Sequence, residues 1–308
     1  MSLVEFFANH TYRMVFLGTV IIGLVAGALG SFAYLRKQSL ISDVISHSAL
    51  PGTLIAFIVA VQIGANGRNM VALMAGAIII GTIAVLCANY ITRATKIRID
   101  TAMAITLASF FGLGMLLMRI IANSSWPGKG GIQDYLFGKA SVLTKADIRV
   151  SAIAGIFALL VVVALWKEFE LRIFDPVFFE VAGFRARLVD VAMFCAIVIA
   201  TVIGVKAVGL VLMVAFVVTP PAAARQWTNS LRSMVILSAL IGGLSSGIGA
   251  YLSIAFGNLP TGPLIAIVLF TIFAISLLIA PGRSIVTKIM ARRRANAELL
   301  AEAREVVA

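Results

Sequence analysis

The sequence predicts an all-α fold, a polytopic transmembrane helical bundle with about nine spans. Hydrophobic residues make up 61% of the 308-residue chain and charged residues 12%, whereas about a quarter of the residues in soluble domains are charged. The mean hydropathy is +1.06. Runs such as residues 74–80 are apolar at every position, while a membrane barrel strand alternates polar and apolar residues over about ten positions. The spans are therefore predicted to be helices.

Nine apolar runs are long enough to cross a hydrocarbon core about 30 Å thick. In chain order they cover residues 14–35, 41–63, 70–91, 101–122, 150–166, 188–204, 207–224, 233–256 and 262–280. The first run is longer than a signal-peptide core and lacks a convincing cleavage site, so we expect it to be retained. Because only Lys206 separates the sixth and seventh runs, eight to ten spans fit the pattern. Residues 1–282 are expected to form one transmembrane domain, followed by a basic tail at 283–308.

The distribution of Lys and Arg predicts the orientation of the chain. With the N-terminus outside, 17 of the 25 basic residues fall in inner segments, as the positive-inside rule requires. The net charge of +12 does not indicate nucleic-acid binding, because the basic residues form short clusters between apolar runs. We expect a multi-pass membrane protein, in contact with lipid and not with nucleic acid.

Two connections are long enough to bind other proteins. The outer one, residues 123–149, is a candidate docking site for an extracytoplasmic partner. The inner one, residues 167–187, mixes aromatic and charged residues, and Asp175 followed by Pro176 predicts a helix start. An amphipathic helix is expected there on the cytoplasmic face. It either docks a cytoplasmic protein or rests on the lipid headgroups, and the sequence leaves both open.

Asp43 and His47 are the strongest candidates for a functional site. Residues four apart lie on one face of a helix, and at about 1.5 Å per residue His47 would lie roughly 9 Å into its span. Ionisable groups at such depth usually face a cavity or a transport path. Carboxylate plus imidazole suits Mn²⁺, Fe²⁺ or Zn²⁺. One chain supplies only two strong ligands, so two copies, giving two Asp and two His, would nearly complete a metal shell.

Two further patterns concern the helices themselves. Pro220 and Pro221 remove two backbone donors and are expected to break or end their helix, either as a gate or hinge or as a simple helix terminus. Glycines also form small-residue stripes, which more often pack helices than contact ligands. The stripes consist of Gly23, Gly27 and Gly30 in the first span and Gly243, Gly247 and Gly249 in the eighth.

The sequence contains no phosphate-binding G-x-x-x-x-G-K-[ST] motif, so ATP-driven transport would need a separate ATPase chain. An ion-coupled secondary metal transporter is the first alternative, because Asp43 and His47 are also suited to relaying protons. It ranks second because clear inverted repeats are missing. An intramembrane metalloenzyme ranks third, because no H-E-x-x-H-like cluster accompanies the pair.

Together these motifs resemble the membrane-spanning permease subunits of metal-ion ABC importers of the manganese, zinc and iron type. The resemblance covers nearly the whole chain. Its motifs lie at residues 35–43, 46–52, 135–138, 174–176, 208–212, 221–225, 245–249 and 260–263. The chain departs from the commonest pattern in having Pro220 directly before Pro221.

The resemblance implies a non-enzymatic permease that pairs with an identical or homologous permease. Its partners would be an extracytoplasmic metal-binding protein and two cytoplasmic ATPase subunits. Asp43 and His47 match the family's metal path, and Phe174, Asp175, Pro176 and Gly183 lie in the segment that docks the ATPase. No permanently bound cofactor is expected, only a transported Mn²⁺, Zn²⁺ or Fe²⁺, with Mn²⁺ favoured.

Overall fold

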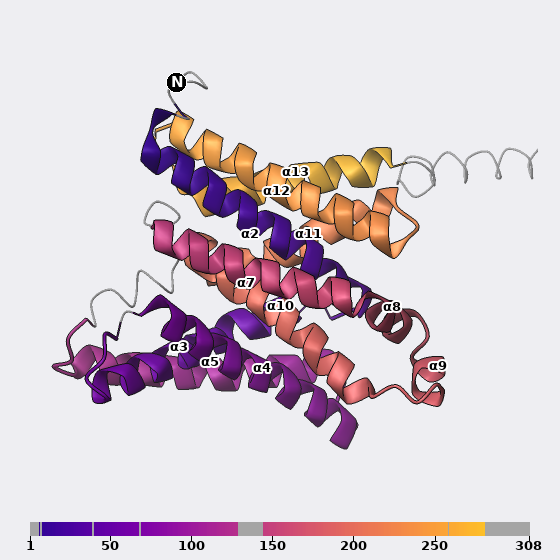
Figure 1. Ribbon diagram of the computed structural model, residues 1–308, viewed down its shortest axis with the longest axis horizontal. Helices are drawn as coiled ribbons and strands as arrows, with labels where there is room; N and C mark the ends of the chain where they lie inside the picture. The colour runs from indigo at the N-terminus through magenta and orange to yellow at the C-terminus, as the bar shows by residue number, and fades with distance from the viewer. Residues whose placement is uncertain are drawn as a thin grey trace, which may run out of the picture.

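The computed structural model describes residues 6, 8–38, 40–67, 69–128, 144–257 and 259–280. These residues form eleven helices and no strand, labelled here as in Figure 1. The helices are α2 (His10–Leu35), α3 (Ile41–Gln62), α4 (Met70–Ala94), α5 (Ile99–Asn123), α7 (Lys145–Ala164), α8 (Trp166–Phe174), α9 (Pro176–Val181), α10 (Ala186–Val208), α11 (Leu210–Trp227), α12 (Leu231–Ala255) and α13 (Thr261–Ile279).

Eight of these helices are long and apolar enough to cross a membrane: α2, α3, α4, α5, α7, α10, α12 and α13. Helix α11 is a further apolar helix of 18 residues that lies outside this count. The predicted helical bundle of eight to ten spans is therefore confirmed. The C-terminal tail, residues 283–308, lies outside the described residues.

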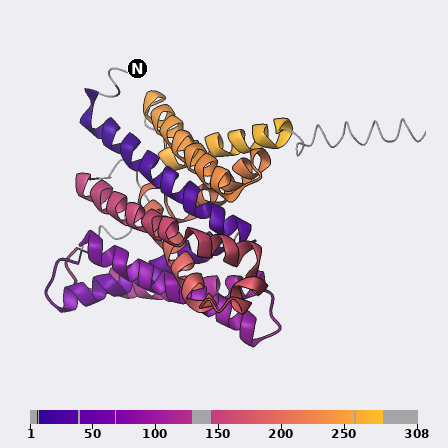
Figure 2. The ribbon, with the colours of Figure 1, turned by 45° about the vertical axis from the view of Figure 1, so that its right-hand side comes forward.

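The long helices form two groups, with α10 and α7 between them (Figure 1). Helices α2, α11, α12 and α13 pack together on one side, and α3, α4 and α5 pack together on the other. The same division is visible after a 45° turn (Figure 2). Because α10 contacts α2, α3, α4, α7 and α11, it links segments that are far apart in the sequence.

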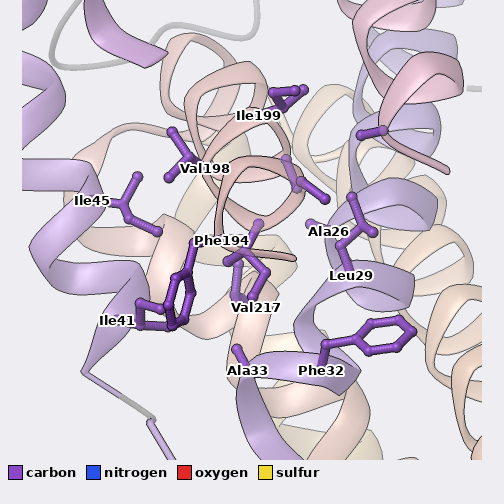
Figure 3. Close-up of a cluster of buried hydrophobic side chains, with 14 of the residues drawn as sticks. Ala26, Leu29, Phe32, Ala33, Ile41, Ile45, Phe194, Val198, Ile199 and Val217 are labelled. Atoms are coloured by element: carbon purple, nitrogen blue, oxygen red, sulfur yellow. The ribbon is translucent and has the colours of Figure 1, made fainter. Parts of the chain in front are cut away.

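The main hydrophobic core lies where α2, α3, α10 and α11 meet. Figure 3 shows its labelled side chains, which are Ala26, Leu29, Phe32, Ala33, Ile41, Ile45, Phe194, Val198, Ile199 and Val217. Ile41 and Ile45 are fully buried and come from one face of α3. That face fixes the rotation of α3 about its own axis, which decides where its polar residues point.

Small residues let α2 and α12 approach closely. A Cβ atom added at Gly23 would overlap the carbonyl oxygen of Gly242, so only glycine fits there. One turn along the contact, the Ser238 hydroxyl donates a hydrogen bond of 2.6 Å to the Gly27 carbonyl. Backbone proximity joined to an interhelical hydrogen bond is the usual way in which membrane helices pack. The interpretation of the glycine stripes as packing surfaces is confirmed.

Some helix ends differ from the predicted boundaries. Helix α7 begins at Lys145, five residues before the predicted span, because Thr144 and Asp147 form a capping box ahead of the apolar run. Helices α10 and α11 are joined by Gly209 alone. Gly209 has φ 87° and ψ 166°, a conformation essentially restricted to glycine. The chain can therefore change direction within one residue.

The helix-terminus interpretation of Pro220 and Pro221 is wrong. Both prolines lie inside α11, which continues to Trp227. Pro221 has no N–H to donate to the carbonyl of Val217, four residues earlier. That carbonyl lies directly against Gly30 of α2, where a Cβ atom would overlap it. The point at which α11 loses this hydrogen bond is therefore packed against α2.

Candidate functional site

Asp43 and His47 lie one turn apart near the start of α3, and their side chains meet. His47 Nε2 is 3.4 Å from Asp43 Oδ1, and the side chains are 19% and 32% exposed respectively. This separation is longer than a charge-assisted hydrogen bond of about 2.7–2.9 Å. Two ligands each about 2.1 Å from one tetrahedral ion are about 3.4 Å apart. The pair is therefore spaced as two ligands of one metal ion would be.

The pair points away from the hydrophobic core. Since each helix residue turns by about 100°, Asp43 lies about 200° around α3 from Ile41, and His47 the same angle from Ile45. The His47 ring instead meets the edge of Phe111 on α5, with the ring centroids 4.9 Å apart. His47 Nδ1 is buried and has no hydrogen-bond partner among the described residues. The histidine is positioned by ring packing and has a free nitrogen.

A single copy of the chain does not complete a metal shell. Within the described ranges, no group of three or more His, Cys, Asp or Glu side chains comes together. The buried hydroxyls of Ser42 and Ser46 also lack hydrogen-bond partners in that part of the chain, and each precedes one of the pair by one residue. No sequence pattern points to these two serines.

The segment predicted as one amphipathic helix over residues 167–187 is two helices, α8 and α9. Asp175 separates them with φ −139° and ψ 76°, because the residue before a proline is disfavoured in the helical region. The Asp175 carboxylate accepts a hydrogen bond of 2.9 Å from the Phe178 N–H, and Pro176 occupies the first helical position. The predicted helix start at these two residues is confirmed.

The α8–α9 segment exposes apolar side chains while one aromatic residue anchors it. Phe179 is fully buried and stacks on Phe184 with the ring centroids 4.9 Å apart. The exposed side chains are Phe174, Val177, Phe178, Val181 and Phe184. Gly183 has φ 82°, the left-handed conformation that commonly ends a helix. An anchored apolar surface of this kind is suited to binding another protein.

Sequence reasoning missed a cluster of ion pairs centred on Asp190 of α10. Arg36, Arg93 and Arg172 all reach its carboxylate. The signal was present, because Asp190 is an acidic residue inside a predicted span, the feature that drew attention to Asp43. The cluster also shows that the C-terminal ends of α2, α4 and α8 and the start of α10 lie together. This end of the molecule, the basic end, is the one that the charge distribution predicts to be cytoplasmic.

The structure leaves one predicted docking region undescribed. Most of the outer connection, including the motif at residues 135–138, lies outside the described residues.

Comparisons with known proteins bear on these features. The model of the ABC 3 transport family matches residues 9–280. A zinc transport system membrane protein, TroC of Treponema pallidum, is 37% identical over 295 residues, covering 96% of this chain and 97% of its own. A manganese transport system membrane protein, MntC of Bacillus subtilis, is 37% identical over 292 residues, covering 93% of this chain and 66% of its own.

Two solved structures share the fold of this chain. The chain superimposes on PsaBC from Streptococcus pneumoniae, solved in complex with Fab, with a TM-score of 0.78 and 30% identity, covering 92% of this chain and 98% of that one. An inward-facing putative metal-chelate type ABC transporter matches with a TM-score of 0.62 at 16% identity, covering 86% and 85%, which shows the fold alone. The predicted multi-pass location, transport class and family resemblance are confirmed: this chain is a membrane-spanning permease of the ABC 3 transport family.

Proposed function

We propose that the chain is the permease subunit of an ATP-driven importer that carries a divalent transition metal across a bacterial cytoplasmic membrane. The Asp43–His47 pair is the observation that carries this proposal. Its 3.4 Å spacing and its position on the side of α3 that faces away from the hydrophobic core suit an ion that passes along the surface of the subunit. The relatives named for zinc and manganese transport support the same class of cargo.

The cargo is Mn²⁺, Zn²⁺ or Fe²⁺, of which Mn²⁺ is favoured. One carboxylate and one imidazole accept all three ions. The imidazole nitrogen disfavours Ca²⁺, which prefers an all-oxygen shell, and the pair lacks the sulfur ligands that Cu⁺ prefers. Names among the relatives include both zinc and manganese systems. The ion is a transported substrate, and no resident cofactor is part of the mechanism.

The proposed assembly contains two permeases, identical or homologous, with their Asp43 and His47 faces opposed. A metal-binding protein on the outer side releases an ion between them, where the two pairs replace part of its hydration shell. Two ATPase subunits bind at the basic end, against the exposed side chains of α8 and α9. Phe174, Asp175, Pro176 and Gly183 shape that docking surface. The permease itself carries out no covalent chemistry.

Helix α11 supplies the proposed gate. Pro220 and Pro221 leave two carbonyls without helical donors, and α11 contacts α3, α10 and α2. A helix weakened at one point and packed beside the metal-bearing helix is suited to bending there when the subunits move. In this proposal α11 is the hinge that exchanges outer and inner access.

The test is uptake of radiolabelled Mn²⁺, with Zn²⁺ and Fe²⁺ as competitors, in cells that express the complete transporter. Asp43→Ala and His47→Ala should each abolish uptake at normal membrane abundance, because each removes half of the chain's ligands. Asp100→Ala, an exposed carboxylate at the start of α5, is the matched control and should transport normally. Wild-type uptake by both site variants would refute the proposed metal path.

The same assay separates an ATP-driven importer from an ion-coupled carrier. Uptake that stops on ATP depletion and persists with a protonophore supports the importer. The reverse pattern would assign Asp43 and His47 to proton relay instead.

A further inference from the structure

Asp190 binds three arginines that come from three different helices. It lies in the second turn of α10, and its side chain is 4% exposed. Arg36, which caps the C-terminus of α2, donates to Oδ1 at 2.7 Å. Arg93, in the last turn of α4, donates to Oδ2 at 3.2 Å. Arg172 of α8 donates through Nε to Oδ1 at 3.1 Å and through Nη2 to Oδ2 at 3.0 Å.

These contacts saturate the carboxylate. A carboxylate offers about four lone-pair sites, and four N–H groups occupy them. A buried charge that loses one of its partners is strongly destabilised, so each arginine constrains the position of Asp190. The paired Nε and Nη2 contacts of Arg172 also fix its orientation, because a two-point guanidinium contact is directional.

Arg172 extends the network to α9. Its Nη1 donates to Glu180 Oε1 at 3.1 Å, and its guanidinium lies 5.8 Å from the centroid of the Phe179 ring. Hydrogen bonding to Asp190 is the largest of the effects that raise the pKa of Arg172 above its already high value. The guanidinium thus stays charged at every physiological pH.

Arg36 extends the network toward α3. It lies in the turn between α2 and α3, seven residues before Asp43, and its guanidinium also covers the Phe194 ring at 4.9 Å. Lys37 in the same turn has φ 56°, so the backbone turns sharply there. A displacement of Arg36 would be passed directly to the start of the helix that carries the metal pair.

The network is more than an attachment for α8. Apolar contacts already hold α8 on α2, since Phe169 is fully buried and its ring lies 5.7 Å from that of Phe32. Beside Asp190, an open pocket of about 490 Å³ lies between parts of α4 and α10 and is lined by Tyr90, Arg93 and Asp190, among other residues. Because Arg93 of α4 and Arg36 at the end of α2 bind the same carboxylate as Arg172, the ion pairs connect α8 to α4 and to the α2–α3 turn as well.

We propose that Asp190 is a positioning residue that couples the ATPase-docking helices to the metal path through Arg172 and Arg36. Movement imposed on α8 and α9 is transmitted through the arginine network to the α2–α3 turn, which shifts Asp43 and His47. This inference rests on the proposed function, because it assumes that ATPase subunits bind at α8 and α9.

The experiment compares metal uptake with ATP hydrolysis in the complete transporter reconstituted in vesicles. In Asp190→Asn one acceptor oxygen becomes a donor group that opposes the guanidiniums. The complex should assemble and hydrolyse ATP, but transported Mn²⁺ per ATP should fall at least about fivefold, the lower end of usual coupling effects. Mn²⁺ binding by the detergent-solubilised complex should stay unchanged, because Asp43 and His47 are intact.

Arg232→Gln is the matched control. Arg232 is exposed at the start of α12 and forms no ion pair among the described residues, so its replacement should leave the ratio at the wild-type value. Arg172→Lys keeps the charge but loses the two-point contact, and it should give an intermediate ratio. If Asp190→Asn does not assemble, Arg172→Gln replaces it and should show the same loss of ions per ATP.

Two results would overturn the proposal. One is a wild-type ratio of ions to ATP in Asp190→Asn or in Arg172→Gln. The other is a parallel fall of uptake, hydrolysis and abundance in every network variant, which would make the cluster purely structural. Failure of the wild-type complex to carry metal would refute the proposed function instead, so the two failures are distinguishable.

Discussion

At the scale of the residue, two helical glycines have opposite surroundings. Gly23 of α2 lies against the backbone of α12, where the Gly242 carbonyl and the Ser246 hydroxyl occupy the space that a Cβ atom would need. Gly112 of α5 has no atom within 4 Å of such a Cβ. Neither has a positive φ. The two positions therefore separate the effect of packing from the intrinsic helix propensity of alanine.

Gly23→Ala should lower the thermal unfolding midpoint of the purified permease by at least about 4 °C, because α2 and α12 must separate to admit the methyl group. Gly112→Ala should leave the midpoint unchanged or raise it, since alanine favours the helix by roughly 1 kcal/mol. Fluorescence-monitored heating of both variants in detergent provides the measurement. Equal midpoints would mean that the α2–α12 contact is not close-packed in solution.

Individual residues also show which features of the site the sequence does not predict. The spacing of Asp43 and His47 predicts their contact, because a helix brings residues four apart together. It does not fix which way the pair faces, since that depends on Ile41 and Ile45 entering the core. Asp190 shows the same limit, because its arginine partners are 154, 97 and 18 residues away.

At the scale of the element, α9 is a short helix whose shape depends on its cap. It has only six residues, too few to be stable alone. Asp175 caps its N-terminus, Pro176 starts it and Gly183 ends the turn that follows. With Phe179 buried, Val177, Phe178 and Val181 are left on the outer surface, beside Phe174 at the end of α8. The element is built to present these side chains in a fixed arrangement.

Phe174→Ser should weaken attachment of the ATPase and lower transport per ATP, because Phe174 is 56% exposed beside α9. Asp175→Ala should act in the same direction by removing a cap that stabilises the helix by about 1 kcal/mol. Phe256→Ser is the control, since Phe256 is 70% exposed at the far end of α12. Copurification of the ATPase with each variant measures the attachment, and metal uptake per ATP measures the coupling. Normal attachment and coupling in both would indicate that α8 and α9 only rest on lipid.

The elements were predictable in number and type because each span is a long run of mostly apolar residues. Their ends were less predictable, because hydropathy ignores polar first turns such as the one at Lys145. The split between α8 and α9 follows from the steric effect of Pro176 on Asp175, and the sequence already contained that signal. The continuation of α11 through two prolines depends instead on contacts with α2, which no local pattern records.

At the scale of the whole molecule, the Asp43–His47 pair would form only part of the proposed metal site. Two of the chain's helices, α5 and α13, contribute few buried residues, and the Asp43–His47 face remains partly exposed. In the proposed dimer, a second permease placed against this face would bring two further ligands to the ion.

If the partner permease is a second copy of this chain, the purified permease dimer should bind one Mn²⁺ ion per two chains, because each Asp43–His47 pair would supply half of the ligands. Isothermal titration together with the mass of the detergent-solubilised complex gives this stoichiometry. Asp43→Ala should abolish the binding without changing the mass. One independent ion per chain would contradict the shared site.

The orientation of α3 has a mechanical consequence. One side of the helix is fixed by Ile41 and Ile45 among α2, α10 and α11, so the metal ligands on its other side cannot swing far by themselves. In the proposed transporter, the aperture for the ion would then widen and narrow as whole helices move, with α3 shifting and α11 bending, rather than by rotation of single side chains. As the opposed Asp43–His47 pairs of the two permeases approach and separate, they would replace and then release part of the ion's hydration shell.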